Sequence, residues 1–518
     1  MKHNLMNPLL VATALVGCTS TGEKGKSELA LPSLPNAGKP MNVIFILSDD
    51  HRYDYMGFMN TVPWLETPAM DRMAAEGAHL KNAFVTTSLS SPSRASILTG
   101  MYSHTHQVVD NAAPLPEGLR FYPEYLQAAG YKTAFYGKWH MGDASGTPQP
   151  GFDHWEAFKG QGEYYNPRIN TNGEWIKYKD STYVTDLLTE HALSFIDKQS
   201  KEEKPFFVYL SHKGVHASFE PAKRHVGCYA GKELVLPPTF EIPKYGLTAL
   251  PTKDPQTGKA AHGKDFYGER MLPNWVKNQR ESWHGVDYAY DGKPWDDQVR
   301  GYCETLRAVD ESIGTVLDHL TKTGLAENTL VIYMGDNGFA WGEHGLIDKR
   351  QFYEESVRVP MLAWSPKLFK GGTVVEKMVQ NVDIAPTVLA AAGLDKAKQM
   401  VGYSFLPLLK GEKVQWRDRI FYEYYWEHEF PQTPTMHGVR TDDYKYIRYH
   451  GVWDTNEFYD LKNDPNETNN LIHAPEHQET IKKLNHELYN WMESTDGMYI
   501  PLKRTERPHI DHRNKGYY

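Results

Sequence analysis

Five runs of apolar residues in this chain have the length and composition of buried β-strands. Residues 42–47 (NVIFIL) and 329–334 (TLVIYM) are almost continuously apolar, which is typical of strands covered on both faces. The other three runs lie at residues 133–136, 205–210 and 359–364. We expect all five strands to belong to one sheet.

Segments with helical periodicity separate these runs. The longest covers residues 302–322, where apolar residues recur three or four positions apart and so share one helix face. Shorter helices are expected at residues 68–76, 121–129, 181–198 and 382–393. Strands that alternate with helices predict a doubly wound α/β domain.

The pattern changes near residue 413, and the rest of the chain indicates a second, smaller domain. Short aromatic strands are predicted at residues 420–425, 437–441, 444–449 and 457–460. One helix is predicted after them, at residues 475–491. We therefore divide the folded chain into a large α/β domain at residues 41–412 and a small α+β domain with an antiparallel sheet at residues 413–518. The irregular stretch 227–298 is expected to cross the face that carries the active site.

Oxygen-bearing side chains follow the two most apolar strands. Asp49 and Asp50 come after the strand at 42–47, and Asp336 and Asn337 come after the strand at 329–334. The carboxyl ends of parallel strands share the sheet edge where α/β proteins bind ligands. Carboxylate and amide oxygens suit calcium first and magnesium second, and argue against zinc. The alternative is that each acidic pair caps a helix, and finding two such pairs favours the metal.

Residues 83–100 (AFVTTSLSSPSRASILTG) place hydroxyl side chains ahead of a predicted helix. Pro92 suits the first helical position, and Ser91 suits the N-cap before it. Ser90 would then lie at the helix N-terminus, where free N–H groups and the helix dipole favour negative charge, with Arg94 in reach. This position suits a nucleophile that meets an anion; a serine-rich loop that only caps a helix is the alternative.

Three further polar residues follow predicted strands. Lys138 and His140 come after the strand at 133–136 and are two residues apart, so an extended chain would direct them to the same side. His216 follows the strand at 205–210. Each could instead be a solvated or structural side chain, but their place at the ligand-binding edge favours a site.

Residues 90–94 (SSPSR), with 98–100 (LTG) behind them, resemble the signature of the sulfatases, (Cys or Ser)-x-Pro-x-Arg with an LTG tail. Residues 137–140 (GKWH) resemble a second motif of that family, and His216 and Lys349 match two further family positions. The resemblance implies an alkaline-phosphatase-like fold, in which a mixed sheet is flanked by helices and the larger domain is catalytic.

The resemblance also implies the cofactors. Ser90 would be oxidised after translation to formylglycine (3-oxoalanine), the catalytic aldehyde. A calcium ion would be bound by the strand-end residues and by the oxygen of residue 90, that is by Asp49, Asp50, Ser90, Asp336 and Asn337. Because residue 90 is Ser and not Cys, the expected maturation partner is the oxygen-independent radical enzyme of bacteria.

A reaction sequence follows from the same resemblance. A hydroxyl of the hydrated formylglycine, activated by the metal and Arg94, would attack sulfur in line, with Lys138 bridging the formylglycine and the sulfate. His216 and Lys349 would assist the departing alcohol, because a sugar alkoxide is a poor leaving group. His140 would then remove a proton, so that sulfate is released and the aldehyde re-forms. An unmodified Ser90 is expected to be inactive or limited to one turnover.

The substrate is predicted from residues 84–111 and 348–354, which are similar to glucosamine-6-sulfatases and extracellular heparan endosulfatases. We expect a 6-O-sulfated N-acetylglucosamine residue of heparan sulfate, keratan sulfate or a mucin glycan; sulfated galactose, N-acetylgalactosamine or uronic acid are the alternatives. The candidate sugar contacts are His104, His344, Trp426, His428, His437 and Arg440. Packing in the core or at the surface would explain each of them equally well.

Composition narrows the class of protein. The 518 residues carry a net charge of −9, which argues against a nucleic-acid partner. Two other classes of protein are the alternatives: a phosphatase or phosphodiesterase of the same superfamily, whose usual zinc ligands are not matched here, and a lipoprotein that binds glycans without catalysis.

The N-terminus resembles a bacterial lipoprotein signal. An apolar run at residues 9–16, too short to span a membrane, precedes Gly17 and Cys18. We expect residues 1–18 to form the lipoprotein signal, with Cys18 as the lipidated first mature residue, and residues 19–40 to form a flexible tether. The chain would then be a periplasmic or outer-membrane lipoprotein of a Gram-negative bacterium, attached only through its lipid; a soluble secreted protein is the alternative. Cys228 and Cys303 could form at most one disulfide.

Overall fold

The computed structural model describes residues 40–142, 146–240, 272–279, 282, 284–287, 292–451 and 454–500. The predicted signal peptide with Cys18, nearly all of the tether, and part of the irregular stretch 227–298 lie outside these ranges. Over the described residues, every helix is too short or too polar to cross a bilayer. Cys228 is exposed and Cys303 is buried, and both are free thiols.

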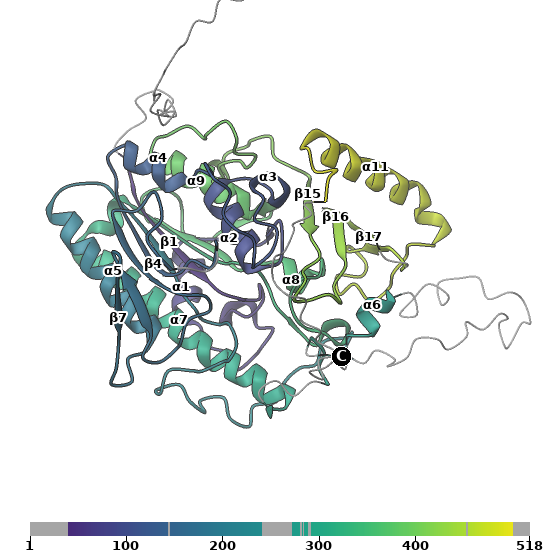
Figure 1. Ribbon diagram of the computed structural model, residues 1–518, viewed down its shortest axis with the longest axis horizontal. Helices are drawn as coiled ribbons and strands as arrows, with labels where there is room; N and C mark the ends of the chain where they lie inside the picture. Colours follow the sequence, from purple (N-terminus) through teal and green to yellow (C-terminus); the bar gives the residue numbers. More distant parts are fainter. Residues whose placement is uncertain are drawn as a thin grey trace, which may run out of the picture.

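A ten-stranded mixed sheet forms the centre of the molecule, with the strand order β13-β2-β12-β9-β1-β8-β4-β5-β6-β7 (Figure 1). The first four predicted strands are confirmed and lie side by side as β9 (Thr329–Gly335), β1 (Asn42–Ser48), β8 (Phe206–Ser211) and β4 (Lys132–Lys138), all parallel. Their carboxyl ends therefore meet at one edge. The fifth, β12 (Met361–Trp364), joins the sheet but runs antiparallel to β9.

The remaining strands are short or lie toward the sheet edges, so their apolar pattern is weak. In the large sheet they are β2 (Ala78–Leu80), β13 (Thr373–Val375), β5 (His154–Phe158), β6 (Arg168–Thr171) and β7 (Glu174–Lys177). Two small pairs stand apart from it: β3 (Ala83–Phe84) with β14 (Val379–Gln380), and β10 (Ala340–Trp341) with β11 (Ile347–Asp348).

Helices cover both faces of the sheet because successive side chains of a strand point to opposite faces. Val43, Phe45 and Leu47 of β1 pack into one core cluster, and Ile44 and Ile46 pack into another. The first cluster is closed by α2 (Ser90–Thr99), α4 (Tyr122–Ala128) and α9 (Ile384–Ala391). The second is closed by α1 (Pro68–Glu76), α5 (Val184–Lys201) and α7 (Trp295–Thr323), on the opposite side of the sheet in Figure 1.

Helix α7 begins seven residues before the predicted start. Pro294 occupies its N-cap, and Asp296 and Asp297 lie in its first turn, where carboxylates complement the helix dipole. The helix ends at Gly324, whose φ of +75° suits a residue without a side chain. The predicted apolar face is confirmed, because its members are all buried: Leu306, Val309, Ile313, Val316, Leu317 and Leu320.

The predicted antiparallel sheet of the C-terminal part is also confirmed. It consists of β15 (Arg419–Tyr424), β16 (Thr435–Thr441), β17 (Tyr444–His450) and β18 (Glu457–Asp460), and α11 (Gln478–Ser494) packs on it (Figure 1). The boundary at residues 412/413 stays a prediction. The short helices are α3 (Ser103–His106), α6 (Asn274–Lys277), α8 (Glu354–Val357) and α10 (Leu406–Leu409).

Candidate active site

The polar residues after β1 and β9 come together because the two strands are parallel and in register, with Ser48 opposite Gly335. The Asp50 N–H donates to Asp336 Oδ1 at 3.0 Å. Carboxylate oxygens of Asp49, Asp50 and Asp336 lie within 4.8 Å of one another. Each of the three residues is at most 1% exposed. Three carboxylates are therefore concentrated at one buried point of the sheet edge.

This cluster has the chemistry of a site for a hard cation. Burial and the neighbouring Asp49 and Asp336 raise the pKa of Asp50 to about 7, against the opposing charge of Lys349. Asn337 donates its Nδ2 to Asp50 Oδ1 at 2.7 Å, but its buried Oδ1 has no hydrogen-bond partner. Crowded carboxylates beside an unpartnered amide oxygen are the ligand set that calcium and magnesium prefer. The residues present thus fit the predicted metal.

Helix α2 brings Ser90 to this cluster. The helix begins at Ser90 after an extended Leu89, so the prediction of Ser91 as N-cap and Pro92 as first residue is wrong by two positions. Ser91 Oγ donates to the carbonyl of His140, so it is not the acceptor for N–H groups of the first turn that an N-cap serine would be. Pro92 costs no hydrogen bond there, because the first four N–H groups of a helix have no intrahelical acceptor. Ser90 Oγ donates to Asp49 Oδ1 at 3.3 Å.

The Arg94 guanidinium binds the carboxylates around Ser90. Its Nε donates to Asp336 Oδ2 at 3.0 Å, and its Nη1 donates to the carbonyl of Lys138 and to Ser211 Oγ, both at 2.7 Å. Its Nη2 lies 3.7 Å from Asp49 Oδ2. Arg94 therefore connects the ends of β9, β4, β8 and β1.

Lys138 is the last residue of β4, and its ammonium pairs with Asp49. Burial alone would raise the pKa of Asp49, but the nearby charges of Lys138, His216 and Arg94 hold it well below its usual value. Gly137, with a φ of +109°, is required here, since a Cβ would lie 1.8 Å from the Ser211 carbonyl oxygen.

His140 also faces the cluster, although the chain is not extended there as predicted: its φ is +53°. Its Nδ1 lies 3.4 Å from Ser91 Oγ, and its Nε2 lies 3.2 Å from Gln161 Nε2. Burial and the charge of Lys138 hold its pKa well below the usual value, so the ring is neutral at pH 7.

His216 and Lys349 lie on the other side of the cluster, around Asp50. His216 Nδ1 donates to the carbonyl of Ala217 at 2.7 Å, and its Nε2 lies 3.9 Å from Asp50 Oδ2. The Lys349 ammonium pairs with Asp50 Oδ1. The structure thus brings together all the residues for which the sequence predicts catalysis or metal binding.

A cavity of about 190 Å³ opens beside His216, Lys349 and Asp50. Its other polar walls are side chains that the sequence analysis did not single out: Asn111, Gln161, Gln298, Asp348 and Arg350. Apolar walls come from Phe219, Phe339, Trp341, Ile347 and Phe430. Asp348 and Arg350 could have been noticed from their places next to Lys349, whereas Asn111 and Gln161 lie on separate loops and Gln298 lies in the first turns of α7, without a local motif.

Arg350 is held in place at the cavity wall. Its Nη1 pairs with Asp348 and its Nε donates to Glu427 Oε1 at 2.8 Å, while its guanidinium carbon lies 3.8 Å from the Phe430 ring centre. His284 Nδ1 lies 3.0 Å from Asp348 Oδ2. The described part of the irregular stretch therefore does reach the rim of the site.

The structure corrects two of the predicted sugar contacts. His104 is bonded on both ring nitrogens, to Glu423 Oε2 at 2.7 Å and to the carbonyl of Thr495 at 2.9 Å. Arg440 is buried and its guanidinium pairs with Glu354 at 3.1 and 3.2 Å. Their polar atoms are used to hold the C-terminal part against the large domain, so neither is free for a sugar.

Four other predicted contacts also lie outside the cavity lining. His344 is buried and stacks on Tyr353 at 4.0 Å, and His437 is buried beside Tyr425. Trp426 is 48% exposed, with His428 near it, on the segment that supplies Phe430 to the cavity. For Trp426 and His428 a sugar contact stays a prediction.

Comparison with known proteins agrees with this geometry. The family model described as Sulfatase matches residues 41–394, and the model described as N-sulphoglucosamine sulphohydrolase, C-terminal, matches residues 342–494. The N-acetylglucosamine-6-O-sulfatase of Bacteroides thetaiotaomicron is 34% identical, with 96% of this chain and 92% of the relative aligned. The N-acetylglucosamine-6-sulfatase of Homo sapiens is 30% identical, over 76% of this chain and 69% of the relative.

A solved structure shares the fold. It is described as a complex of a protein with its substrate D-glucosamine-2-N,6-O-disulfate, and it superposes with a TM-score of 0.77 at 30% identity. The match covers 90% of this chain and 100% of the other. The alkaline-phosphatase-like arrangement of a large mixed sheet, flanking helices and a small C-terminal sheet is thereby confirmed.

Proposed function

The chain belongs to the sulfatase family of sulfuric ester hydrolases, and from this we propose that it removes the 6-O-sulfate of an N-acetylglucosamine residue in a sulfated glycosaminoglycan or mucin glycan. The observation that carries the proposal is the convergence of Ser90, Lys138, His140, His216 and Lys349 on one buried carboxylate cluster beside a cavity. Two close relatives carry the name of this activity, and the solved neighbour binds a 6-O-sulfated glucosamine.

Asp49, Asp50, Asp336 and Asn337 would hold a divalent cation, for which we propose calcium, with magnesium as the second choice. Such an ion would bind the sulfate oxygens and withdraw charge from sulfur. The chain's own contribution is a rigid, water-poor frame, because Arg94 ties the ends of four strands to the carboxylates.

A formylglycine at position 90 would supply an oxygen nucleophile and a route for sulfate release that a plain serine lacks. The fold prepares this position, since residue 90 is the first residue of α2 and its side chain already reaches Asp49. Free N–H groups at the helix start favour the negative charge of a sulfate ester. His140 is neutral at pH 7 and lies against Ser91, the neighbour of residue 90, and its proposed role is to accept a proton from residue 90 during sulfate release.

Lys349 and His216, which line the cavity, would assist the departure of the sugar oxygen. Burial would lower the pKa of Lys349, but Asp50 and Asp348 raise it above its ordinary value, so the side chain is an ammonium at neutral pH. It can therefore donate a proton or a hydrogen bond to an alkoxide that leaves poorly on its own. His216 also lines the cavity, with its Nε2 3.9 Å from Asp50 Oδ2, and we propose that it contacts the same sugar oxygen, while the proton comes from Lys349.

The cavity has the size and lining of a site for a single sugar ring. At about 190 Å³ it is smaller than the ~300–1,000 Å³ typical of sites for drug-sized ligands. Neutral amides of Asn111, Gln161 and Gln298 can bind hydroxyl or N-acetyl groups, and the fixed Asp348–Arg350 pair offers both an acceptor and donors.

The test is a screen on protein co-expressed with a radical maturation enzyme, with Ser90→Ala as control. 6-Sulfated N-acetylglucosamine, galactose and N-acetylgalactosamine are compared with a 2-sulfated uronic acid and with glucosamine 6-phosphate. We expect turnover to be fastest for the first. Faster hydrolysis of another sulfated sugar would overturn the substrate, and hydrolysis of the phosphate with inert sulfates would indicate a phosphatase.

The maturation enzyme, the lipid on Cys18 and a periplasmic or outer-membrane location remain proposals from the sequence alone. Binding of sulfated glycans without turnover by any matured sample would favour the glycan-binding lipoprotein instead.

A further inference from the structure

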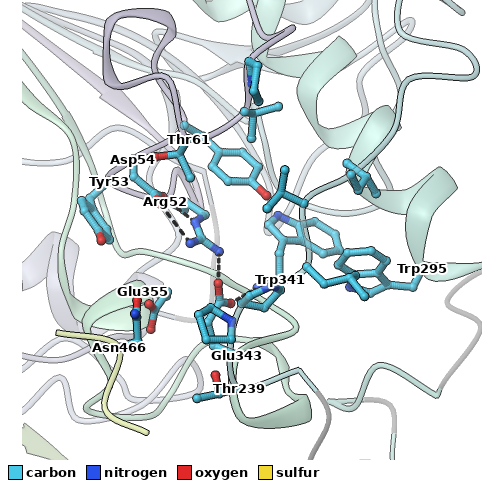
Figure 2. A pocket seen from close by; sticks show the side chains of 18 of the residues that line it. Arg52, Tyr53, Asp54, Thr61, Thr239, Trp295, Trp341, Glu343, Glu355 and Asn466 are labelled. Carbon is cyan, nitrogen blue, oxygen red and sulfur yellow. Dashed lines mark hydrogen bonds and ion pairs between the residues drawn. The ribbon is translucent and has the colours of Figure 1, made fainter. Parts of the chain in front are cut away.

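A second cavity, of about 170 Å³, shares one wall with the active-site cavity, because Trp341 lines both. Its walls come from segments far apart in the sequence: residues 52–55, 61–64, 234–239, 295, 341, 343, 355 and 466. Figure 2 shows Arg52 extending between Asp54 and Glu343, with Trp341 and Trp295 to one side and Glu355 to the other. None of these side chains has a role in the mechanism above.

The apolar part of this second cavity consists of fixed aromatic planes. Trp64 and Trp295 line it and are both partly exposed. Trp64 is anchored by its Nε1, which donates to the Glu233 carbonyl at 2.7 Å, and by the Tyr229 ring at 4.8 Å. Leu236 adds an aliphatic surface that is 48% exposed. Rigid, partly exposed aromatic faces bind flat apolar surfaces, such as the C–H face of a pyranose ring, at low entropic cost.

The polar part is an ion-pair network with excess negative charge. Arg52 donates to both carboxylate oxygens of Asp54, at 2.5 and 3.1 Å, and to Glu343 Oε1 at 2.7 Å. Glu343 Oε2 accepts a hydrogen bond from the backbone N–H of Trp341 at 2.8 Å. One guanidinium thus faces two carboxylates, and the network also holds the backbone of Trp341 in place.

Glu355 lines the same cavity but takes no part in this ion-pair network. Only 7% of the residue is exposed, and no cationic side chain in the described ranges pairs with its carboxyl. Burial and the nearby Glu343 raise its pKa well above the usual value. A neutral carboxyl is both donor and acceptor, which matches a sugar hydroxyl.

We propose that this cavity is a second sugar subsite, in which an uncharged pyranose residue of the glycan packs on Trp64 and Trp295 and bonds Glu355. The inference rests on the proposed function and extends it to the neighbouring residue of the substrate. The surplus of carboxylates disfavours a sulfated sugar or a uronic acid. A metal ion does not fit either, because in the described part of the chain the sole group of metal-ligating side chains close enough to share an ion is Asp49, Asp50 and Asp336.

This subsite selects a class of glycan. Chains in which the 6-sulfated residue neighbours uncharged galactose or N-acetylglucosamine, as in keratan-type and mucin-type glycans, place a neutral ring in it. Chains with a uronic acid at every second position place a carboxylate near Asp54 and Glu343, whose two negative charges are matched by Arg52 alone. The enzyme should therefore prefer the former.

The experiment compares two substrates, free N-acetylglucosamine 6-sulfate and the same residue linked to galactose. Trp64→Ala should lower kcat/KM about tenfold for the disaccharide, as expected for one lost stacking contact, and leave the monosaccharide within about twofold. Trp64→Phe keeps an aromatic face and should retain most of the effect. Trp175→Ala, a partly exposed tryptophan on edge strand β7, is the matched control and should change neither.

Binding supplies an arm that does not need turnover. Calorimetry with unsulfated N-acetyllactosamine, on protein with Ser90 unmodified, should show binding that Trp64→Ala weakens and Trp175→Ala does not. Equal losses on both substrates, equal binding by the two variants, or tighter binding of a glucuronate disaccharide would each overturn the subsite. Absence of turnover on the monosaccharide sulfate would instead refute the proposed function, while the binding arm still decides the cavity.

Discussion

Replacing Lys349 by Met separates leaving-group chemistry from all other contributions to the reaction. Lys349 is 4% exposed, pairs with Asp50 and lines the sugar cavity. Removing its charge takes away the proton donor proposed for the sugar oxygen, and it also leaves Asp50 without that partner. The first effect depends on the leaving group, whereas the second does not.

The magnitude follows from these two parts. Loss of a positioned acid should lower kcat/KM for N-acetylglucosamine 6-sulfate by about 10²–10⁴-fold, or about 2.7–5.4 kcal/mol. An aryl sulfate, whose phenolate leaves without protonation, should lose about tenfold or less. Breaking the buried pair should in addition destabilise the fold by up to ~3–5 kcal/mol, which thermal unfolding measures separately.

The matched control is Lys445→Met. Lys445 is fully buried and pairs with Glu354 and Glu467, outside the cavity. It should cost comparable stability and leave the ratio of the two substrates unchanged. If Lys349→Met lowers both substrates by the same factor, as Lys445→Met would, then Lys349 does not act on the leaving group and the reasoning fails.

Three further outcomes are expected. Chelation of divalent cations should abolish turnover and lower Tm, with calcium but not zinc restoring both, and Asn337→Ala should raise the calcium concentration needed; unchanged activity after chelation would exclude the metal. Arg440→Ala removes one cationic partner of Glu354 and leaves Lys445 as another, so it should cost less stability than the about 3–5 kcal/mol of a buried charge without any partner, with KM within about twofold; a large rise in KM would restore Arg440 as a sugar contact. Burial raises the pKa of Asp310 to about 7 although it accepts the Ala69 and Met70 N–H groups; the stability it contributes is therefore present at low pH and lost as pH rises from about 4 to 7, by about 1.4 kcal/mol per pH unit, and a Tm difference from Asp310→Asn that is constant across this range would contradict the shift.

Local patterns were sufficient for the centre of the fold. The apolar runs of β1 and β9 read as buried strands because both faces are covered, and their parallel register brought Asp49 and Asp336 together as predicted. The strand at residues 359–364 was found for the same reason, but its antiparallel direction was not, since direction depends on the connection and not on composition.

Predictions failed where a residue far away in the sequence determines the contacts of a side chain. His104 looked available, but Glu423, 319 positions later, bonds its ring and backbone. The start of α2 was placed two residues too late, and Ser91, the expected cap, bonds the distant His140 carbonyl instead. The cavity walls were not predicted for the same reason, since Asn111 and Gln161 come from separate loops and Gln298 comes from α7.

The central claim is that residue 90 is the nucleophile position of a sulfatase, and its peptide mass tests that most directly. Protein co-expressed with a radical maturation enzyme is digested, and the peptide across Ser90 is weighed beside the turnover of N-acetylglucosamine 6-sulfate. The account predicts a peptide lighter by two hydrogens and activity that scales with the modified fraction. An unmodified serine in active protein, or full modification without activity on any sulfated sugar, would contradict it.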